Sequence, residues 1–121
     1  MNVLWVFLGG GLGSVCRYLI SRGLILLRYQ GVFPLATFLA NTLACLLLGY
    51  LAFRYAGKIS SGHQLFWMVG FCGGFSTFST FSLESWYLLQ GGHYLWLAIN
   101  ILLSLIMGLS IMYAAAAGGP S

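Results

Sequence analysis

The chain has 121 residues, of which 60% are hydrophobic and only 5% are charged. A soluble domain carries about 25% charged residues, so this composition excludes a soluble globular protein. One acidic residue and two separated histidines also leave most acid–base and zinc chemistry without side chains, so we do not expect an enzyme. The net charge of +4 comes from scattered basic residues that flank apolar segments. They favour anchoring at a membrane surface over binding of nucleic acid.

Four apolar segments, each long enough to cross a bilayer core of about 30 Å, predict an all-α membrane protein. The predicted spans are about 3–27, 33–55, 65–89 and 94–117. We therefore expect residues 1–121 to form a single four-helix transmembrane domain with short turns. No basic residue precedes Val3, so we interpret the first segment as a retained span and not as a signal peptide.

The basic residues show no bias between the two ends of the predicted bundle. Arg54 and Lys58 belong to one end and Arg22 and Arg28 to the other, a tally of two against two. Such a bias normally fixes orientation, so its absence predicts dual topology, although so small a sample can balance by chance. Two oppositely inserted copies would pair about a two-fold axis in the membrane plane. We therefore expect an antiparallel homodimer.

The first span combines small residues with a deep charge. Gly9 and Gly13 have the small-xxx-small spacing that allows helices to approach closely. Arg17 lies well inside the apolar stretch and must snorkel, pair with an acid or face a water-filled vestibule. Glu84, the only acid, is expected to pair with Arg17 or Arg22 or to reach water.

The second and fourth spans each carry amide or hydroxyl groups at membrane depth. Asn41 follows the helix-starting Pro34, and it is either a hydrogen-bonding staple between helices or an anion ligand whose NH2 group faces a pathway. In the fourth span, Asn100, Ser104 and Gly108 repeat every four residues and share one face. That face is either a polar track or a helix contact.

The third span contains the most specific sequence, GFCGGFSTFSTFS, from Gly70 to Ser82. The adjacent Gly73 and Gly74 each lower helix preference by about 1 kcal/mol, so we predict a helix break around Gly73 to Ser79. Irregular backbone at this depth occurs only where protein buries it or where it lines a cavity. Carbonyl groups released near a two-fold axis would suit one alkali cation.

Phenyl rings and hydroxyls alternate after this predicted break. Phe78 and Phe81 are three residues apart and therefore neighbours on a helix, with Ser79 and Thr80 between them. A phenyl ring has a positive edge, so a ring edge directed into a narrow pore attracts an anion. A phenylalanine stripe at this spacing is also typical of simple core packing.

Three motifs resemble those of the Fluc (CrcB-type) fluoride channels, and the resemblance extends across nearly the whole chain. The segment GGGLGSVCRY is similar to the family's GGxxGxxxRY, FPLATFLAN is similar to FPxGTxxxN, and GFCGGFSTFSTFS is similar to the third-helix signature. The resemblance implies a multi-pass protein of the bacterial inner membrane that assembles as a dual-topology homodimer. It also implies two parallel fluoride pathways, a central structural Na⁺ and passive export of F⁻ that lowers fluoride toxicity in the cell.

The resemblance further implies roles for individual residues. The backbone carbonyls of Gly73 and Ser76 are the implied Na⁺ ligands, and Arg17 is the candidate vestibule residue. The implied fluoride pathway contains Asn41, Phe78, Phe81, Ser79, Thr80, Asn100 and Ser104. The chain departs from the family pattern at Ala36, where glycine is usual, at Ser76, where threonine is commoner, and at Gly108, where some relatives carry a hydroxyl.

Two other functions remain open from the sequence. A dual-topology small multidrug exporter, which is a proton-coupled cation carrier, also has four helices, but it requires a membrane carboxylate and only Glu84 is available. A structural helix-packing module would explain the small-residue spacing. Fluoride efflux without a proton gradient, cation exchange with one, or no flux would separate the three.

Overall fold

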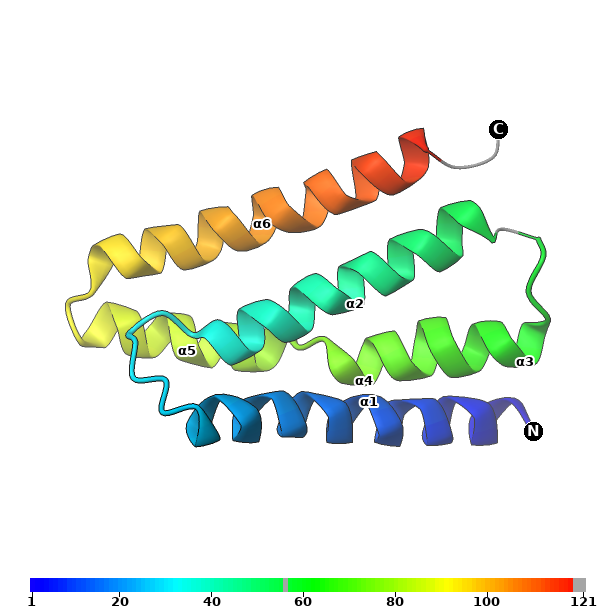
Figure 1. Cartoon of the computed structure of the whole chain (residues 1–121), viewed down its shortest axis with the longest axis horizontal. Helices are drawn as coiled ribbons and strands as arrows, with labels where there is room; N and C mark the ends of the chain where they lie inside the picture. The colour runs from blue at the N-terminus through cyan, green and yellow to red at the C-terminus, as the bar shows by residue number, and fades with distance from the viewer. Residues whose placement is uncertain (56, 119–121) are drawn as a thin grey trace.

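Four helical rods make up the computed structural model, which describes residues 1–55 and 57–118 (Figure 1). Three rods are single helices: α1 (Asn2–Leu26), α2 (Leu35–Arg54) and α6 (Tyr94–Ala117). The third rod consists of α3 (Ser61–His63), η1 (Gln64–Cys72), α4 (Gly73–Phe75) and α5 (Phe78–Gln90). The all-α prediction with a broken third helix is confirmed. Ala56 and residues 119–121 of the predicted 1–121 domain lie outside the described residues.

The three single helices are each long and apolar enough to cross a membrane. Helix α1 begins and α6 ends at the same end of the bundle, where α2 also ends (Figure 1). That end carries Arg54 and Lys58, while Arg22 and Arg28 belong to the opposite end. The two-against-two charge balance therefore holds for the folded chain.

An arginine adopts the backbone conformation that closes the end of α1. Arg28 has φ 61°, in the left-handed region that favours glycine. Its N–H donates to the carbonyl of Ile25 and that of Tyr29 donates to Leu24, each at 3.0 Å. This is a Schellman cap. The end of α5 is closed in the same way, with Gly92 at φ 76° in the left-handed position.

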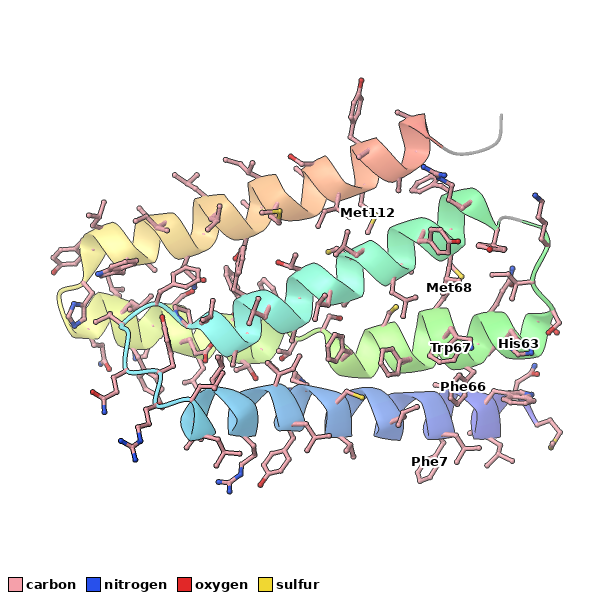
Figure 2. All side chains as sticks on the ribbon, in the orientation of Figure 1. Phe7, His63, Phe66, Trp67, Met68 and Met112 are labelled. Atoms are coloured by element: carbon pink, nitrogen blue, oxygen red, sulfur yellow. The ribbon has the colours of Figure 1, made fainter. Side chains whose placement is uncertain are left out.

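Glycines bring α1 into backbone contact with η1 and α4. A Cβ atom added at Gly9 would overlap the carbonyl of Phe66, and one at Gly13 would overlap the carbonyl of Phe71. Figure 2 shows Phe66 between η1 and α1, where its ring meets Trp5 edge-on with the centroids 6.3 Å apart. The close packing predicted from the small-xxx-small spacing is confirmed.

Helix α2 packs against both α6 and the third rod. A Cβ at Gly49 would lie 3.1 Å from the Cβ of Ala115 and 3.3 Å from the sulfur of Met112, which Figure 2 shows between α6 and α2. On the other side, Ala40 and Ala44 form a buried cluster with Phe75, the last residue of α4. Helix α2 therefore links α6 to the break in the third rod.

Candidate functional site

The third rod is interrupted at Ser76 and Thr77, inside the predicted interval. Both residues are extended, with ψ 158° at Ser76 and φ −154° at Thr77. The reason given for the break was wrong, because Gly73 and Gly74 are helical. Gly74 instead packs against α1, where an added Cβ would overlap the carbonyl oxygen of Gly10. The glycines allow close approach, and the break follows them.

Hydroxyl groups end one helix and begin the next. The Ser76 side chain donates to the carbonyl of Cys72 at 2.7 Å, and the Ser76 N–H donates to the same carbonyl at 3.0 Å. The Thr77 hydroxyl accepts the N–H of Thr80 at 3.1 Å, so it caps the first turn of α5. Serine and threonine compete in this way with the regular helical bonds, which explains the position of the break.

Asn41 of α2 holds the break from the side. Its Oδ1 accepts the Thr77 N–H at 2.7 Å, and its Nδ2 donates to the Thr77 carbonyl at 3.3 Å. The staple interpretation of Asn41 is therefore confirmed. An amide nitrogen carries two N–H donors, and this bond uses one. The other remains for a ligand.

Arg17 approaches the break from α1. Its Nε donates to the carbonyl of Gly74 at 3.3 Å, and the residue is half-buried. Arg17 therefore does not pair with an acid in this structure, since its hydrogen-bond partner is a backbone carbonyl. Arg17 lines none of the described cavities, so its role at a vestibule stays a prediction.

Backbone oxygens at the break suit a hard cation. An unbroken helix would direct the N–H groups of Thr77 and Thr80 to the carbonyls of Gly73 and Ser76, but these donors bond to Asn41 and to the Thr77 hydroxyl. The described residues contain no group of three or more His, Cys, Asp or Glu that could hold a metal. Carbonyl oxygens are suitable ligands for alkali and alkaline-earth ions. The donor set therefore fits the implied Na⁺.

A cavity of about 290 Å³ lies beside the break. It brings together four predicted pathway residues from three helices, and its lining consists of Asn41, Cys45, Ser76, Thr77, Phe78, Phe81, Ser104 and Leu105. The rings of Phe78 and Phe81 are neighbours, with their centroids 6.0 Å apart. Phe81 is half-buried, whereas Phe78 is 79% exposed in the single chain.

A second, much smaller cavity shares part of this lining. It measures about 20 Å³ and is lined by Phe38, Asn41, Thr42, Cys45, Ser104 and Gly108. A cavity of this size holds one water-sized species. The two cavities share Asn41, Cys45 and Ser104, so these side chains stand between them.

Three predicted pathway residues line none of the described cavities. The Ser79 hydroxyl is exposed and lies 3.2 Å from that of Thr77, and Thr80 is engaged in the cap of α5. Asn100 is 1% exposed and donates to the hydroxyl of Ser85 at 3.0 Å, so it makes a contact between α6 and α5. Their place in the pathway stays a prediction.

Two residues at the site were missed from the sequence. Thr77 directly precedes α5 and is a typical N-cap residue, which is a recognisable signal. Cys45 lies four residues after Asn41 on the same helix face. That spacing points to a shared surface, although only the fold shows that α6 completes it.

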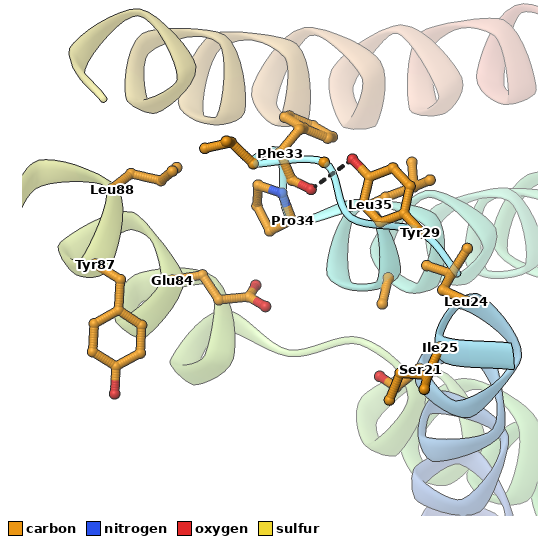
Figure 3. A pocket seen from close by; sticks show the side chains of 13 residues that line it. Ser21, Leu24, Ile25, Tyr29, Phe33, Pro34, Leu35, Glu84, Tyr87 and Leu88 are labelled. Atoms are coloured by element: carbon orange, nitrogen blue, oxygen red, sulfur yellow. Dashed lines mark hydrogen bonds between the residues drawn. The ribbon is translucent and has the colours of Figure 1, made fainter. Parts of the chain in front are cut away.

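Glu84 faces a different cavity, of about 390 Å³, between the first connection and α5 (Figure 3). Its Oε1 is buried and has no hydrogen-bond partner among the described residues. Ser21 contributes to the lining from α1, and the Tyr29 hydroxyl donates to the Phe33 carbonyl at 2.9 Å. The predicted partners Arg17 and Arg22 do not line this cavity.

Comparisons with known proteins place this geometry in a family. A family profile described as CrcB-like protein, Camphor Resistance (CrcB), matches residues 4–117. Similar proteins named fluoride-specific ion channel FluC come from Pyrococcus abyssi, 41% identical over 93% of this chain and 90% of the relative, and from Bacteroides fragilis, 38% identical over 98% and 93%. A third, from Azobacteroides pseudotrichonymphae, is 40% identical over 88% and 86%. The chain therefore belongs to the CrcB-like family of multi-pass membrane proteins.

Proposed function

We propose that this protein is a fluoride-specific ion channel that lets F⁻ leave the cytoplasm passively. The observation that carries the proposal is the cavity at the break, where an amide, a hydroxyl and two phenyl rings meet from α2, α5 and α6. The names of the relatives support the same function. Family membership decides against the multidrug exporter, which depended on Glu84 alone.

The lining supplies the contacts that a dehydrated fluoride ion needs. F⁻ is small and strongly hydrated, so a selective pathway must replace its water by donors that still allow exit. Asn41 keeps one amide N–H beyond its bond to Thr77, and Ser104 offers a hydroxyl from α6. The edges of Phe78 and Phe81 add weak positive potential. None of these groups has to change protonation state during transport.

The functional unit in this proposal is a homodimer of oppositely oriented copies. The two-against-two balance of basic residues between the ends supports insertion in both orientations. The exposure of Phe78 supports a second copy, because a ring that binds a dehydrated anion has to be shielded from lipid and bulk water. Gly73 is likewise exposed, with no atom within 4 Å of an added Cβ.

The proposal includes a central Na⁺ held by the carbonyls of Gly73 and Ser76 from both copies. When bound, the ion supplies a fixed positive charge that holds the two breaks together. The chain prepares this site itself, because Asn41 and the Thr77 hydroxyl take the N–H groups that would otherwise occupy the two carbonyls. The fluoride pathways lie beside the break and do not pass through the cation site.

Flux from liposomes tests the function directly. Purified protein is reconstituted with internal potassium fluoride, and efflux is followed with a fluoride electrode after valinomycin is added, without a proton gradient. The proposal expects rapid F⁻ efflux and much slower Cl⁻ efflux from matched vesicles. Cation exchange that requires a proton gradient would support the exporter instead, and absence of flux from well-folded protein would support a packing module.

A further inference from the structure

Cys45 and Gly108 face each other one helical turn beyond Asn41 and Ser104. Helices α2 and α6 run in the same direction (Figure 1). Asn41 and Cys45 are four residues apart on α2, and Ser104 and Gly108 are four apart on α6, so each pair shares a helix face. All four residues line the cavity of about 20 Å³.

The thiol occupies the space next to the absent side chain of Gly108. A Cβ atom added at Gly108 would lie 3.6 Å from the Cys45 sulfur, an ordinary van der Waals distance, and no other atom would lie within 4 Å. Glycine has no side-chain donor, so α6 offers only Ser104 at this level of the cavity. On the opposite wall, α2 contributes the donor side chains of Asn41, Thr42 and Cys45, and of these only the Cys45 sulfur lies within 4 Å of a Cβ added at Gly108.

Cys45 also stands where three cavities meet. It lines the large cavity with Phe78 and Phe81, the small one with Asn41 and Ser104, and a third of about 170 Å³ with Gly73 and Ser76. Cys16 packs against the buried cluster of Ala40, Ala44 and Phe75 and lines no described cavity. Cys72 shares the third cavity with Cys45 but lines neither of the other two. Of the three cysteines, Cys45 is therefore the one that lines the two cavities containing Asn41 and Ser104.

We propose that the Cys45 thiol provides the donor that Gly108 lacks and so completes the fluoride pathway at its far end. An S–H group is a weak donor, and a site that must release its ion quickly needs weak donors. This inference rests on the proposed function, and it assigns to Cys45 a role in fluoride selectivity and rate that the family motifs do not contain.

The test compares donor loss with donor restoration in the liposome efflux assay. Cys45→Ala and Cys45→Val both remove the S–H group, and their side-chain volumes lie on either side of that of cysteine. Both are expected to lower F⁻ flux about three- to tenfold, the effect of one lost hydrogen bond. Cys45→Ser keeps a donor and is expected to retain flux. Cys16→Ala is the matched control and should behave as wild type.

The decisive variant moves the donor to the opposite wall. Gly108→Ser fits, because its Cβ has room beside the sulfur, and in the double variant Cys45→Ala/Gly108→Ser it should restore most of the lost flux. Wild-type flux in either donor-free variant, or a well-folded double variant that stays as slow as Cys45→Ala, would overturn the proposal. Size-exclusion profiles of every variant report folding. Wild-type protein without fluoride flux would instead refute the proposed function itself.

Discussion

Substituting each of two adjacent glycines with alanine separates packing within the chain from packing between copies. In Gly74→Ala, the new methyl group would overlap the Gly10 carbonyl oxygen and would lie 3.0 Å from its Cα. A backbone obstacle cannot rotate away, so α4 must move off α1 at a cost of about 1–3 kcal/mol. That movement also strains the bond from Arg17 to the Gly74 carbonyl. The gain in helix propensity, about 1 kcal/mol, does not offset these losses.

Gly73→Ala is the matched control, because it has the same chemistry one residue earlier. No atom lies within 4 Å of its added Cβ, so the protomer should keep its stability or gain up to about 1 kcal/mol. Thermal unfolding in detergent, followed by tryptophan fluorescence, measures both variants, and size-exclusion chromatography measures the dimer. The reasoning is refuted if Gly74→Ala unfolds no earlier than Gly73→Ala. A normal dimer in Gly73→Ala would argue against the proposed interface.

Three further outcomes follow from the site. Asn41→Leu leaves the N–H and carbonyl of Thr77 without their partner, so the free energy of unfolding should fall by about 2–6 kcal/mol, measured by the same thermal assay. Phe78→Ile should lower the free energy of unfolding by only about 0.5 kcal/mol, because the ring is 79% exposed, yet Phe78→Ile and Phe81→Ile should each lower F⁻ efflux at least tenfold. Methionine at either position should be tolerated better than isoleucine. Wild-type flux in both isoleucine variants would show that the rings only fill space. Arg28→Gly should be tolerated by the backbone, because glycine readily adopts the φ of 61° found there, and it leaves one basic residue at that end of the bundle against two at the other. A cysteine introduced in the α2–α3 connection and labelled with an impermeant reagent should then show a bias toward one orientation in the membrane.

The number of helices and the interval of the break were predictable because they depend on local composition. Apolar length alone gives the four rods, and their bounds agree with the predictions to within about four residues. The cause of the break was not predictable from propensity. Gly73 and Gly74 both stay helical, although of the two only Gly74 packs against α1. Tertiary contact of the kind that Gly74 makes regularly overrides a difference in helix propensity of about 1 kcal/mol.

The site was predictable in its chemistry but not in its connections. Asn41 was identified as either a staple or a ligand, and only the fold supplies its partner, Thr77, which is 36 residues away in sequence. The four-residue repeat on α6 was identified as either a polar track or a helix contact, and in the structure its members have different roles. Asn100 makes a helix contact with Ser85, while Ser104 lines both cavities. Periodicity identifies a face but not what that face meets.

The same contacts that form the break also prepare the proposed pathway. Asn41 takes the Thr77 N–H, which leaves the Gly73 carbonyl without its helical donor, and the amide that does so still has one N–H for the neighbouring cavity. One side chain therefore joins the proposed cation site to the proposed anion site. A loss of fluoride flux in an Asn41 variant does not by itself identify a ligand, since displacement of the break would also lower the flux. It identifies a ligand only if the variant unfolds like wild type. Phe78 carries no such structural bond, so its variants provide the cleaner measure of anion binding.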